Sequence, residues 1–592
     1  MRRVLLAATV MWLLVMVSLA APRRVGDASE YVAMAGRLAD MGAPTFSARD
    51  MAAFTAAWAG TGTGFELQTR QLPELQGHDG RWDMPHMWLY PLLSVPFVWI
   101  ARIASVGDPW GLVALNVSMV AGLLWLAARR GAGPWTLTLF ASPLVWWLDK
   151  PLADLLIACA VGGATLLWPH PVSLVLLGLA AAQNPALLVG CVVFGLCALT
   201  QDRSRIASRR WQLAVAIGAA GAVIAPIYYL SRLDRLSPLT SYAAASWPSL
   251  TSLLFPLADV NMGVLPRFPP VALVVMVALL QRRGWREPAA LPAALTGAAL
   301  LLVISQQPNM NQGGSPDLSR YIVWLLPLAL PWLLALDRSA RQSTRMTGTL
   351  VLAVTAVWTA IAFLPSRPES YRYPTPFATW VWTQHPSWTM PRAEAFGERT
   401  SHREPAIVPT ATPNCEKVLL FEGRWPSNCP PSTSPPPSCA APGTYCYADR
   451  VTGEPLVPRQ FTVIGPLPQY GPVMNDRTWP SGDASGQWIE SRVRHLSSGE
   501  QASAPASVRG AWSVAWTQSW SSDRALVVYV RDAGQGAQVA IRNRGPLLGL
   551  IETVDGRVFQ RLMLEATTDT PATIELPAAP HLLVSLWPRP GP

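Results

Sequence analysis

The sequence has little charge and almost no lysine. Only 14% of its 592 residues are charged, against about a quarter in a typical soluble domain, and its only lysines are Lys150 and Lys417. Hydrophobic residues make up 51% of the chain, and apolar runs recur through residues 1–365. This combination excludes an ordinary soluble protein and indicates a polytopic α-helical membrane protein.

Familiar catalytic signatures are also missing. The chain has no Walker A loop, no His-Glu-x-x-His motif and no Gly-x-Ser-x-Gly motif in a strand–turn–helix setting. It has no basic, aromatic-interleaved surface of the nucleic-acid-binding type, so no nucleic-acid partner is expected. The net charge of +10 is nearly all arginine, and much of it lies in short loops between apolar runs. We interpret it as an orientation signal, because such loops stay cytoplasmic.

The seven cysteines fall into two groups. Three lie in apolar runs and are expected to be buried thiols. Four lie in a polar, proline-rich tail, where an even number suggests two disulfides and an oxidising compartment. A zinc site is the alternative, although the close Cys-x2-4-Cys pairs typical of such sites are absent. The tail cysteines are Cys415, Cys429, Cys439 and Cys446.

The apolar runs predict eleven spans in a plasma (inner) membrane. Met1-Arg2-Arg3 places the N-terminus in the cytoplasm, residues 22–107 form the first external loop, and the C-terminus lies outside (periplasmic in a bacterium). The tail cysteines require the same side. The expected spans are residues 4–21, 108–128, 135–148, 153–168, 171–182, 185–199, 211–230, 270–281, 288–305, 320–336 and 347–364.

Two apolar regions are ambiguous. Residues 87–105 could cross, but the next run ends in Arg129-Arg130; if these are cytoplasmic, 87–105 is re-entrant or interfacial. Residues 171–199 could form one long span. A tight hairpin broken at Gln183-Asn184-Pro185 instead keeps the following arginines inside.

The chain divides into a transmembrane domain (1–364), a juxtamembrane segment and linker (365–457) and an extracytoplasmic β-rich domain (458–592). Residues 365–400 are aromatic and proline-rich and are expected to lie along the outer membrane surface. Strand-like runs separated by short polar turns predict a small β-sandwich after residue 458. These runs are Phe461–Ile464, Trp512–Trp516, Ala525–Val530, Gln538–Arg542, Val558–Leu564 and His581–Trp587.

Two carboxylates follow the first apolar run, in the stretch from Gly26 to Tyr31. If residues 27–40 are helical, as the apolar spacing indicates, Asp27 and Glu30 share one face. A helix N-terminus at a bilayer surface suits an anionic headgroup. The simpler alternative is that Asp27 only caps this helix.

Other polar residues gather in the predicted external loops, where ionisable groups are functional candidates although many are simply solvated. The histidines and aspartates between His78 and His86 could bind a divalent metal ion. The alternative is that the two histidines are structural. The remaining candidates in these loops are Asp79, Asp149, Asp154, Asp259, Asn261 and Asn311.

Four motifs occur in order over residues 1–365. They are Gly26-Asp27 through Tyr31, Asp79-Gly80 followed by Pro85 through Tyr90 to Leu93, the acidic pair Asp149 and Asp154, and Gly313-Gly314 through Arg320-Tyr321 to Leu326-Pro327. Together they resemble the GT-C superfamily of membrane glycosyltransferases, including the family 39, aminoarabinose and arabinosyl types, which use polyprenyl-phosphate-linked sugars.

The resemblance implies an inverting glycosyltransferase that moves a sugar from a polyprenyl phosphate to a glycan, lipid or protein acceptor outside the cytoplasm. Asp27 would be the catalytic base, with Glu30 beside it, and Asp149 and Asp154 would place the acceptor or a metal. Arg320 and Tyr321 would bind the donor phosphate. The residues implied to line the substrate cavity are Asp79, His86, Tyr90, Asp259, Asn261 and Asn311.

Two departures and two alternatives stand beside this interpretation. Asp154 stands where related sequences tend to have Glu, and the tail matches no enzyme module. A transporter or flippase for lipid-linked glycans would have mid-membrane charges and repeated broken helices. A non-catalytic envelope assembly protein could bind glycan through tail tryptophans (Trp512, Trp516, Trp520), unless these form the sandwich core.

Overall fold

The computed structural model of the chain forms two compact units. The first comprises Met1–Ala56, Thr63–Leu67 and Glu74–Tyr371, and the second comprises Ala57–Gly62, Gln68–Pro73 and Arg372–Pro592. The structure describes residues 2–22, 24–58, 65, 75–201, 208–238, 250–306, 317–339, 341–367, 373–401, 409–426, 429, 437–440 and 444–450, and after these only the strands from residue 461 onward with residues 576–577.

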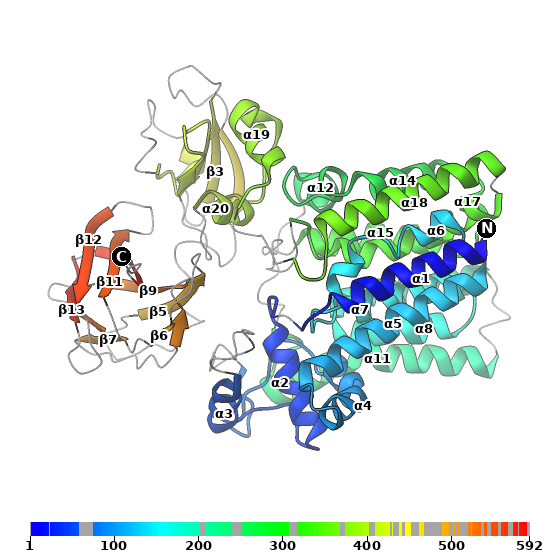
Figure 1. Cartoon of the computed structure of the whole chain (residues 1–592), viewed down its shortest axis with the longest axis horizontal. Helices are drawn as coiled ribbons and strands as arrows, with labels where there is room; N and C mark the ends of the chain where they lie inside the picture. Colours follow the sequence, from blue (N-terminus) through cyan, green and yellow to red (C-terminus); the bar gives the residue numbers. More distant parts are fainter. Residues whose placement is uncertain are drawn as a thin grey trace. The chain divides into compact units, whose positions relative to one another are not determined.

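Helices dominate the first unit (Figure 1). Three of them, α5 (Asp108–Arg130), α11 (Arg209–Leu233) and α18 (Gln342–Ala362), are long and apolar enough to cross a membrane. The other helices of eight or more residues are α1 (Arg2–Ser18), α2 (Ala28–Ala39), α3 (Ala48–Trp58), α4 (Leu89–Ile103), α7 (Asp154–Leu167), α8 (Val172–Gln183), α9 (Leu188–Gln201), α12 (Leu250–Ala258), α14 (Pro269–Leu280), α15 (Ala290–Ser305) and α17 (Leu330–Ser339).

The long helices expose apolar side chains, as expected for helices that face lipid. Ile227 of α11 is 61% exposed and Ile361 of α18 is 71% exposed. Leaving such residues in water would be costly, whereas hydrocarbon accommodates them. The apolar helices therefore agree with the predicted helical membrane protein.

Arginine-rich helix ends gather at one end of the first unit. Arg338 of α17 lies 2.6 Å from a carboxylate oxygen of Glu287 and donates a hydrogen bond to the carbonyl of Arg130 at the end of α5. Asp337 accepts hydrogen bonds from the backbone N–H groups of Gly133 and Thr136 at 2.8 and 2.9 Å. These contacts bring together three segments that the sequence places on the cytoplasmic side.

Both ends of α4 contact helix ends that lie away from the arginine-rich end of the unit. Its first turn is held by Gln183, at the end of α8, which accepts from the backbone N–H of Tyr90 at 2.7 Å and donates to the carbonyl of Met87 at 2.9 Å. At its other end Arg102 contacts Asp108, the first residue of α5, at 2.7 Å. This is the arrangement expected of a helix that enters and leaves at one end without crossing.

The chain breaks between α8 and α9 where the sequence predicts a hairpin. Asn184 caps a short 3-10 turn, η3 (Pro185–Leu187), by accepting from the backbone N–H of Ala186. Helices α8 and α11 run parallel, because Leu174 and Gly178 of α8 lie against Gly218 and Gly221 of α11 in the same order. Small residues at this interface let the two backbones approach closely.

Residues 135–148 are not the single helix that was predicted. They form the four-residue α6 (Pro134–Leu137) and the 3-10 helix η2 (Pro143–Trp147), and every residue of this run is buried. Thr359 of α18 donates to the carbonyl of Ala141. Because protein surrounds the run on all sides, its irregular backbone is satisfied without lipid contact.

The predicted span 320–336 is also broken. It consists of α16 (Ile322–Leu325), the 3-10 helix η6 (Leu326–Ala329) and α17. Pro327 lies at the break, where a proline removes a backbone donor and clashes with the preceding turn. The remaining short elements of this unit are α13 (Val264–Arg267) and η5 (Gly284–Arg286).

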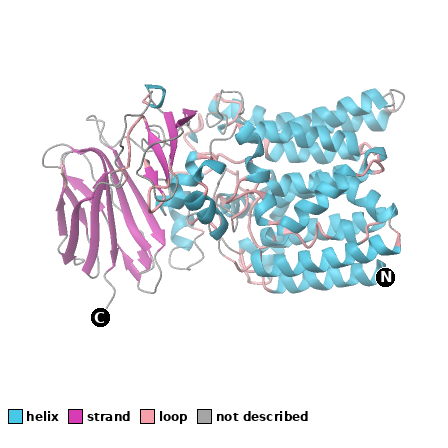
Figure 2. Cartoon of the chain, turned by 90° about the horizontal axis from the view of Figure 1, so that it is seen from above, coloured by secondary structure: helices cyan, strands magenta, loops and turns pink. Residues whose placement is uncertain are grey.

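All the named strands lie in the second unit (Figure 2). Strands β12, β11, β14, β9 and β5 form a five-stranded antiparallel sheet, and β13, β10 and β7 form a three-stranded one. Five of the six predicted strand runs are strands, and Trp512–Trp516 lies outside the described residues. The strands from this part of the chain are β4 (Phe461–Pro466), β5 (Trp488–His495), β6 (Gln501–Ser503), β7 (Ala506–Arg509), β8 (Ser519–Ser521), β9 (Arg524–Ala533), β10 (Gln538–Ile541), β11 (Pro546–Thr553), β12 (Val558–Glu565), β13 (Ala572–Glu575) and β14 (Ala579–Pro588).

The segment predicted as a linker contains folded elements. They are α19 (Pro376–Gln384), α20 (Ala393–Ser401), β1 (Thr410–Ala411), β2 (Lys417–Phe421) and β3 (Thr444–Asp449), with the 3-10 turns η7 (Pro386–Trp388) and η8 (Pro437–Cys439). Strand β4, expected to open the later domain, instead pairs with β3. Burial of the whole of β2 explains why this proline-rich segment folds.

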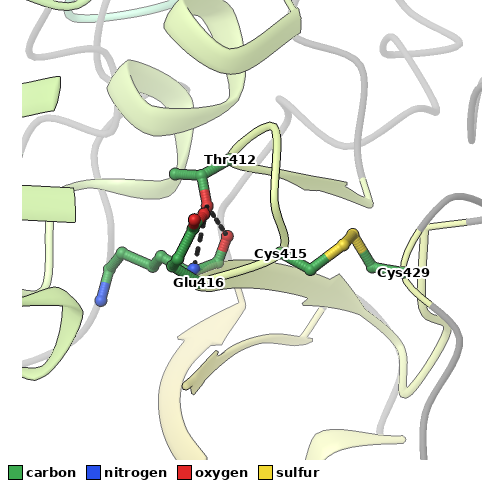
Figure 3. The surroundings of a disulfide bond; sticks show 5 residues. Thr412, Cys415, Glu416 and Cys429 are labelled. Carbon is green, nitrogen blue, oxygen red and sulfur yellow. Dashed lines mark hydrogen bonds between the residues drawn. A yellow bond between two sulfur atoms is a disulfide. The ribbon is translucent and has the colours of Figure 1, made fainter. Parts of the chain in front are cut away.

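The four tail cysteines form two disulfides, as predicted. Cys415 pairs with Cys429 and Cys439 with Cys446. Beside the first bond, Thr412 donates to the carboxylate of Glu416 and accepts from the backbone N–H of Lys417 (Figure 3). The disulfides therefore close short loops around β2 and β3.

Candidate functional site

Asp27 immediately precedes α2, but its side chain does not cap that helix. No cap hydrogen bond from the Asp27 side chain is present. Gly26 has a positive φ of 46°, which turns the chain as it enters α2. The Asp27 carboxylate instead lies 3.4 Å from Nε2 of His86 and 3.5 Å from Nη1 of Arg320.

His86 joins the two carboxylates that the sequence singles out. Its Nδ1 lies 2.9 Å from Oε2 of Glu30, and its Nε2 faces Asp27. Burial by itself lowers the pKa of His86, but the charge of Asp27 and the hydrogen bond and charge of Glu30 outweigh it and raise that pKa above 6.5. The two acids therefore favour the charged form of the imidazole between them.

Arg320 closes the cluster from a distant part of the sequence. Its side chain is only 11% exposed, whereas that of Asp27 is 35% exposed. Its Nε makes no hydrogen bond among the described residues. Asp154 at the start of α7 contributes a nearby negative charge and accepts a hydrogen bond from Trp324 at 2.9 Å. The arrangement therefore has a largely buried guanidinium with unused hydrogen-bonding capacity next to an accessible carboxylate.

Aromatic rings border the cluster. Tyr31 lies 5.5 Å from the ring of His86 and 5.6 Å, edge to face, from the ring of Tyr90. Tyr90 is fully buried and its hydroxyl donates to Asn116 at 3.0 Å. Tyr321 is buried against Trp324, with the guanidinium of Arg320 5.9 Å from its ring centre. These rings fix the directions of the polar side chains.

The same cluster has the donor atoms of a cation site. One ligand atom each from Asp27, Glu30 and His86 lies within 4.8 Å of the others, and all three residues are partly exposed. Two carboxylates and one imidazole suit a divalent transition metal. His86 already pairs with both acids, so a metal would have to displace its proton.

Asp149, predicted to act with Asp154, has a different environment. It is fully buried, pairs with the equally buried Lys150 and accepts from the backbone N–H of Ala21 at 3.1 Å. Lys150 also donates to the carbonyl of Pro365 at 2.8 Å. This pair ties the chain after α1 to the chain after α18.

Asp79 belongs to a second polar network, in the predicted first external loop (residues 22–107). Arg232, at the end of α11, contacts Asp79 at 2.9 Å and Asp83 at 2.7 Å. The hydrogen bond from Arg232 lowers the pKa of Asp79, whereas burial raises that of Asp83. This network binds the segment around Asp79 and Asp83 to the end of α11.

Asp259 and Asn261 form a turn beside the segment that carries Arg320. Asp259 accepts from the backbone N–H groups of Asn261 and Met262, both at 2.9 Å. The backbone N–H of Ser319 donates to the carbonyl of Met262 at 3.0 Å. This turn therefore holds the backbone just before Arg320 in place. Asn311 lies outside the described residues.

Sequence reasoning missed the roles of Arg232, Trp324 and Asn116. Arg232 could have been noticed, since it lies at the predicted outer end of a span, against the positive-inside tendency. Asn116 inside an apolar helix was a similar signal, because a buried amide needs partners; it donates to the carbonyl of Lys150 at 2.8 Å. Nothing in the sequence distinguishes Trp324 from the other tryptophans.

No protein-family model and no curated protein matches the sequence. Among solved structures the chain is similar to the crystal structure of ArnT from Cupriavidus metallidurans in the apo state, with 20% sequence identity and a TM-score of 0.36. The match covers 60% of this chain and 64% of that one, less than two thirds of its length. A likeness of this size decides neither fold nor function, so the site itself must carry the functional argument.

Proposed function

We propose that the protein is a membrane glycosyltransferase of the GT-C type. It would move a sugar from a polyprenyl phosphate to an acceptor on the extracytoplasmic side, with inversion at the anomeric carbon. The observation that carries the proposal is the pairing of an accessible, non-capping carboxylate, Asp27, with the largely buried guanidinium of Arg320 at 3.5 Å.

The reaction needs a base and a group that accepts negative charge. Asp27 takes the proton from an acceptor hydroxyl as its oxygen attacks the anomeric carbon. The bond from that carbon to the phosphate oxygen breaks, and the polyprenyl phosphate leaves with the electron pair. Arg320 stabilises this anion through N–H groups aimed at its oxygens. Protons and charges balance, because Asp27 ends the step protonated.

The resting ion pairs fit this sequence of events. Asp27 lies beside His86 and Arg320, and the positive charge of both partners weakens it as a base. A donor phosphate that engages Arg320 removes part of that attraction. The carboxylate of Asp27 then becomes more basic. Its position is kept by His86, which Glu30 holds in place through the shorter contact of 2.9 Å.

Sugar transfer by the purified protein tests the proposal. The full chain in nanodiscs would receive radiolabelled polyprenyl-phosphate sugars with membrane extract as acceptor. Asp27→Asn keeps the shape but removes the base, so we expect transfer to fall about a hundredfold or more. Asp234→Asn is the matched control, because Asp234 is 79% exposed and its positive φ of 55° suits asparagine; it should transfer like the wild type.

Equal transfer by wild type and Asp27→Asn would remove Asp27 as base and turn attention to Asp154. Transfer by neither protein, with the lipid still bound, would favour the transporter. One observation supports that second candidate: the segments 134–150 and 322–339 are broken helices, as in many transporters. The charged cluster, however, lies at one end of the helices, where a transferase would need it.

A further inference from the structure

Helix α19 presents aromatic side chains outward. Phe377, Trp380 and Trp388 are 47%, 44% and 66% exposed. Trp380 contacts the rings of His385 at 4.8 Å and Trp388 at 5.9 Å, and His385 stacks on Trp388 at 3.9 Å. We call these four residues the aromatic patch. Large exposed rings held together on a surface mark an interaction site more often than chance.

The opposite face of α19 fixes the patch on its unit. Ala378, Val381 and Trp382 are buried, and the ring of Trp382 packs against Phe396 at 4.9 Å. Thr375 caps the helix by accepting from the backbone N–H of Ala378 at 3.1 Å. The patch therefore comprises the outer face of α19 and the turn that follows it, and the inner face of this helix is anchored in the core of the unit.

Charge and chain length indicate what covers the patch. No aspartate or glutamate occurs between Glu369 and Glu394, so the segment carries no acid that a lipid headgroup layer would repel. Helix α18, which is long and apolar enough to cross a membrane, ends at Ala362. Residues 363–375 extend to at most roughly 45 Å, so the chain allows α19 to reach the membrane surface where α18 would leave it.

We propose that the aromatic patch inserts into the outer membrane–water interface. Tryptophan is enriched at that depth, because its ring is apolar while its N–H can remain in the headgroup region. The inserted face would dock the second unit on the bilayer and set its orientation. The proposal requires α18 to cross the membrane but does not depend on the transfer reaction.

Photocrosslinking on the full chain in phosphatidylethanolamine–phosphatidylglycerol nanodiscs tests it. p-Benzoylphenylalanine would replace Trp388 or Trp380, with two control positions on the same unit. Arg424 is 49% exposed but lies away from α19 in the sequence, and Trp382 is buried. We expect lipid adducts at positions 388 and 380 about tenfold above both controls.

Adducts at Trp388 no more abundant than at Arg424 would overturn the proposal. Lipid adducts at Trp382 equal to those at Trp388 would also overturn it, since the patch would then have no preferred face. Adding a soluble cell-wall oligosaccharide distinguishes the other occupant: sugar adducts in place of lipid at position 388 would make the patch a glycan platform.

Discussion

At the scale of single residues, the main result is how four charges meet. Asp27 and Glu30 come from the start of α2, His86 from the segment just before α4 and Arg320 from a distant part of the sequence. That Asp27 and Glu30 lie on one side of the helix start was predictable, since residues three apart share a helix face. His86 was predicted as a cavity-lining residue and as part of a run that left a metal ion open, and its position between two acids required the tertiary fold.

His86 gives a pH-dependent prediction. Its pKa in the folded protein is raised above 6.5, so its charge stabilises the fold fully below that value and the contribution disappears as pH rises through the raised pKa. His86→Gln should therefore lower the thermal midpoint at about pH 5.5 and have a smaller effect at about pH 9. Thermal unfolding in detergent at both pH values measures this.

His78→Gln is the matched control, because His78 pairs with Asp234 at an exposed position where such pairs contribute little. It should leave the midpoint nearly unchanged at either pH. A His86→Gln effect of the same size at both pH values would show that the ring acts through packing and that its charge contributes nothing.

At the scale of elements, close packing of small residues decides which helices are neighbours. A Cβ at Gly178 of α8 would lie 2.6 Å from both Cα and the carbonyl oxygen of Gly218 in α11. Two backbones this close leave no room for a methyl group. Hydropathy alone could not choose the hairpin over one long span; the charge pattern favoured it, and the parallel packing of α8 and α11 agrees with it.

Substitution at this contact tests its importance. Gly178→Ala should destabilise the protein by about 1–3 kcal/mol, because backbone atoms on both sides cannot yield easily. Gly122→Ala in α5 is the control: nothing lies within 4 Å of its Cβ position, and alanine favours a helix by about 1 kcal/mol. Thermal midpoints in detergent should fall for the first and not for the second; the reverse order would contradict the packing.

At the scale of the whole molecule, two independent signals predict how the chain is oriented in the membrane. The arginine-rich helix ends share one end of the first unit, and the second unit carries two disulfides. Disulfides persist in oxidising compartments, whereas arginine-rich loops stay cytoplasmic. Both signals predict that the second unit lies outside the cytoplasm.

Reporter fusions test this orientation in bacterial cells. Alkaline phosphatase folds only outside the cytoplasm, where its own disulfides can form, so a fusion after Pro592 should be active. A fusion after Arg341, between α17 and α18, should be inactive, and the same two sites fused to a cytoplasmic fluorescent reporter should give the opposite pattern. Activity at Arg341 and none at Pro592 would invert the whole topology.

The sequence by itself determined the helical membrane character, the break at Asn184, the disulfide-forming tail, most strands and the acidic pair at the start of α2. These follow from local hydropathy, periodicity and cysteine spacing, which neighbouring residues in the chain encode. Tertiary structure decided that residues 135–148 form two short buried elements and not one helix, that Asp149 pairs with Lys150, and that Asp27 faces His86 and Arg320. Each of these depends on partners distant in sequence, because buried charges and irregular backbone persist only where other segments supply their hydrogen bonds.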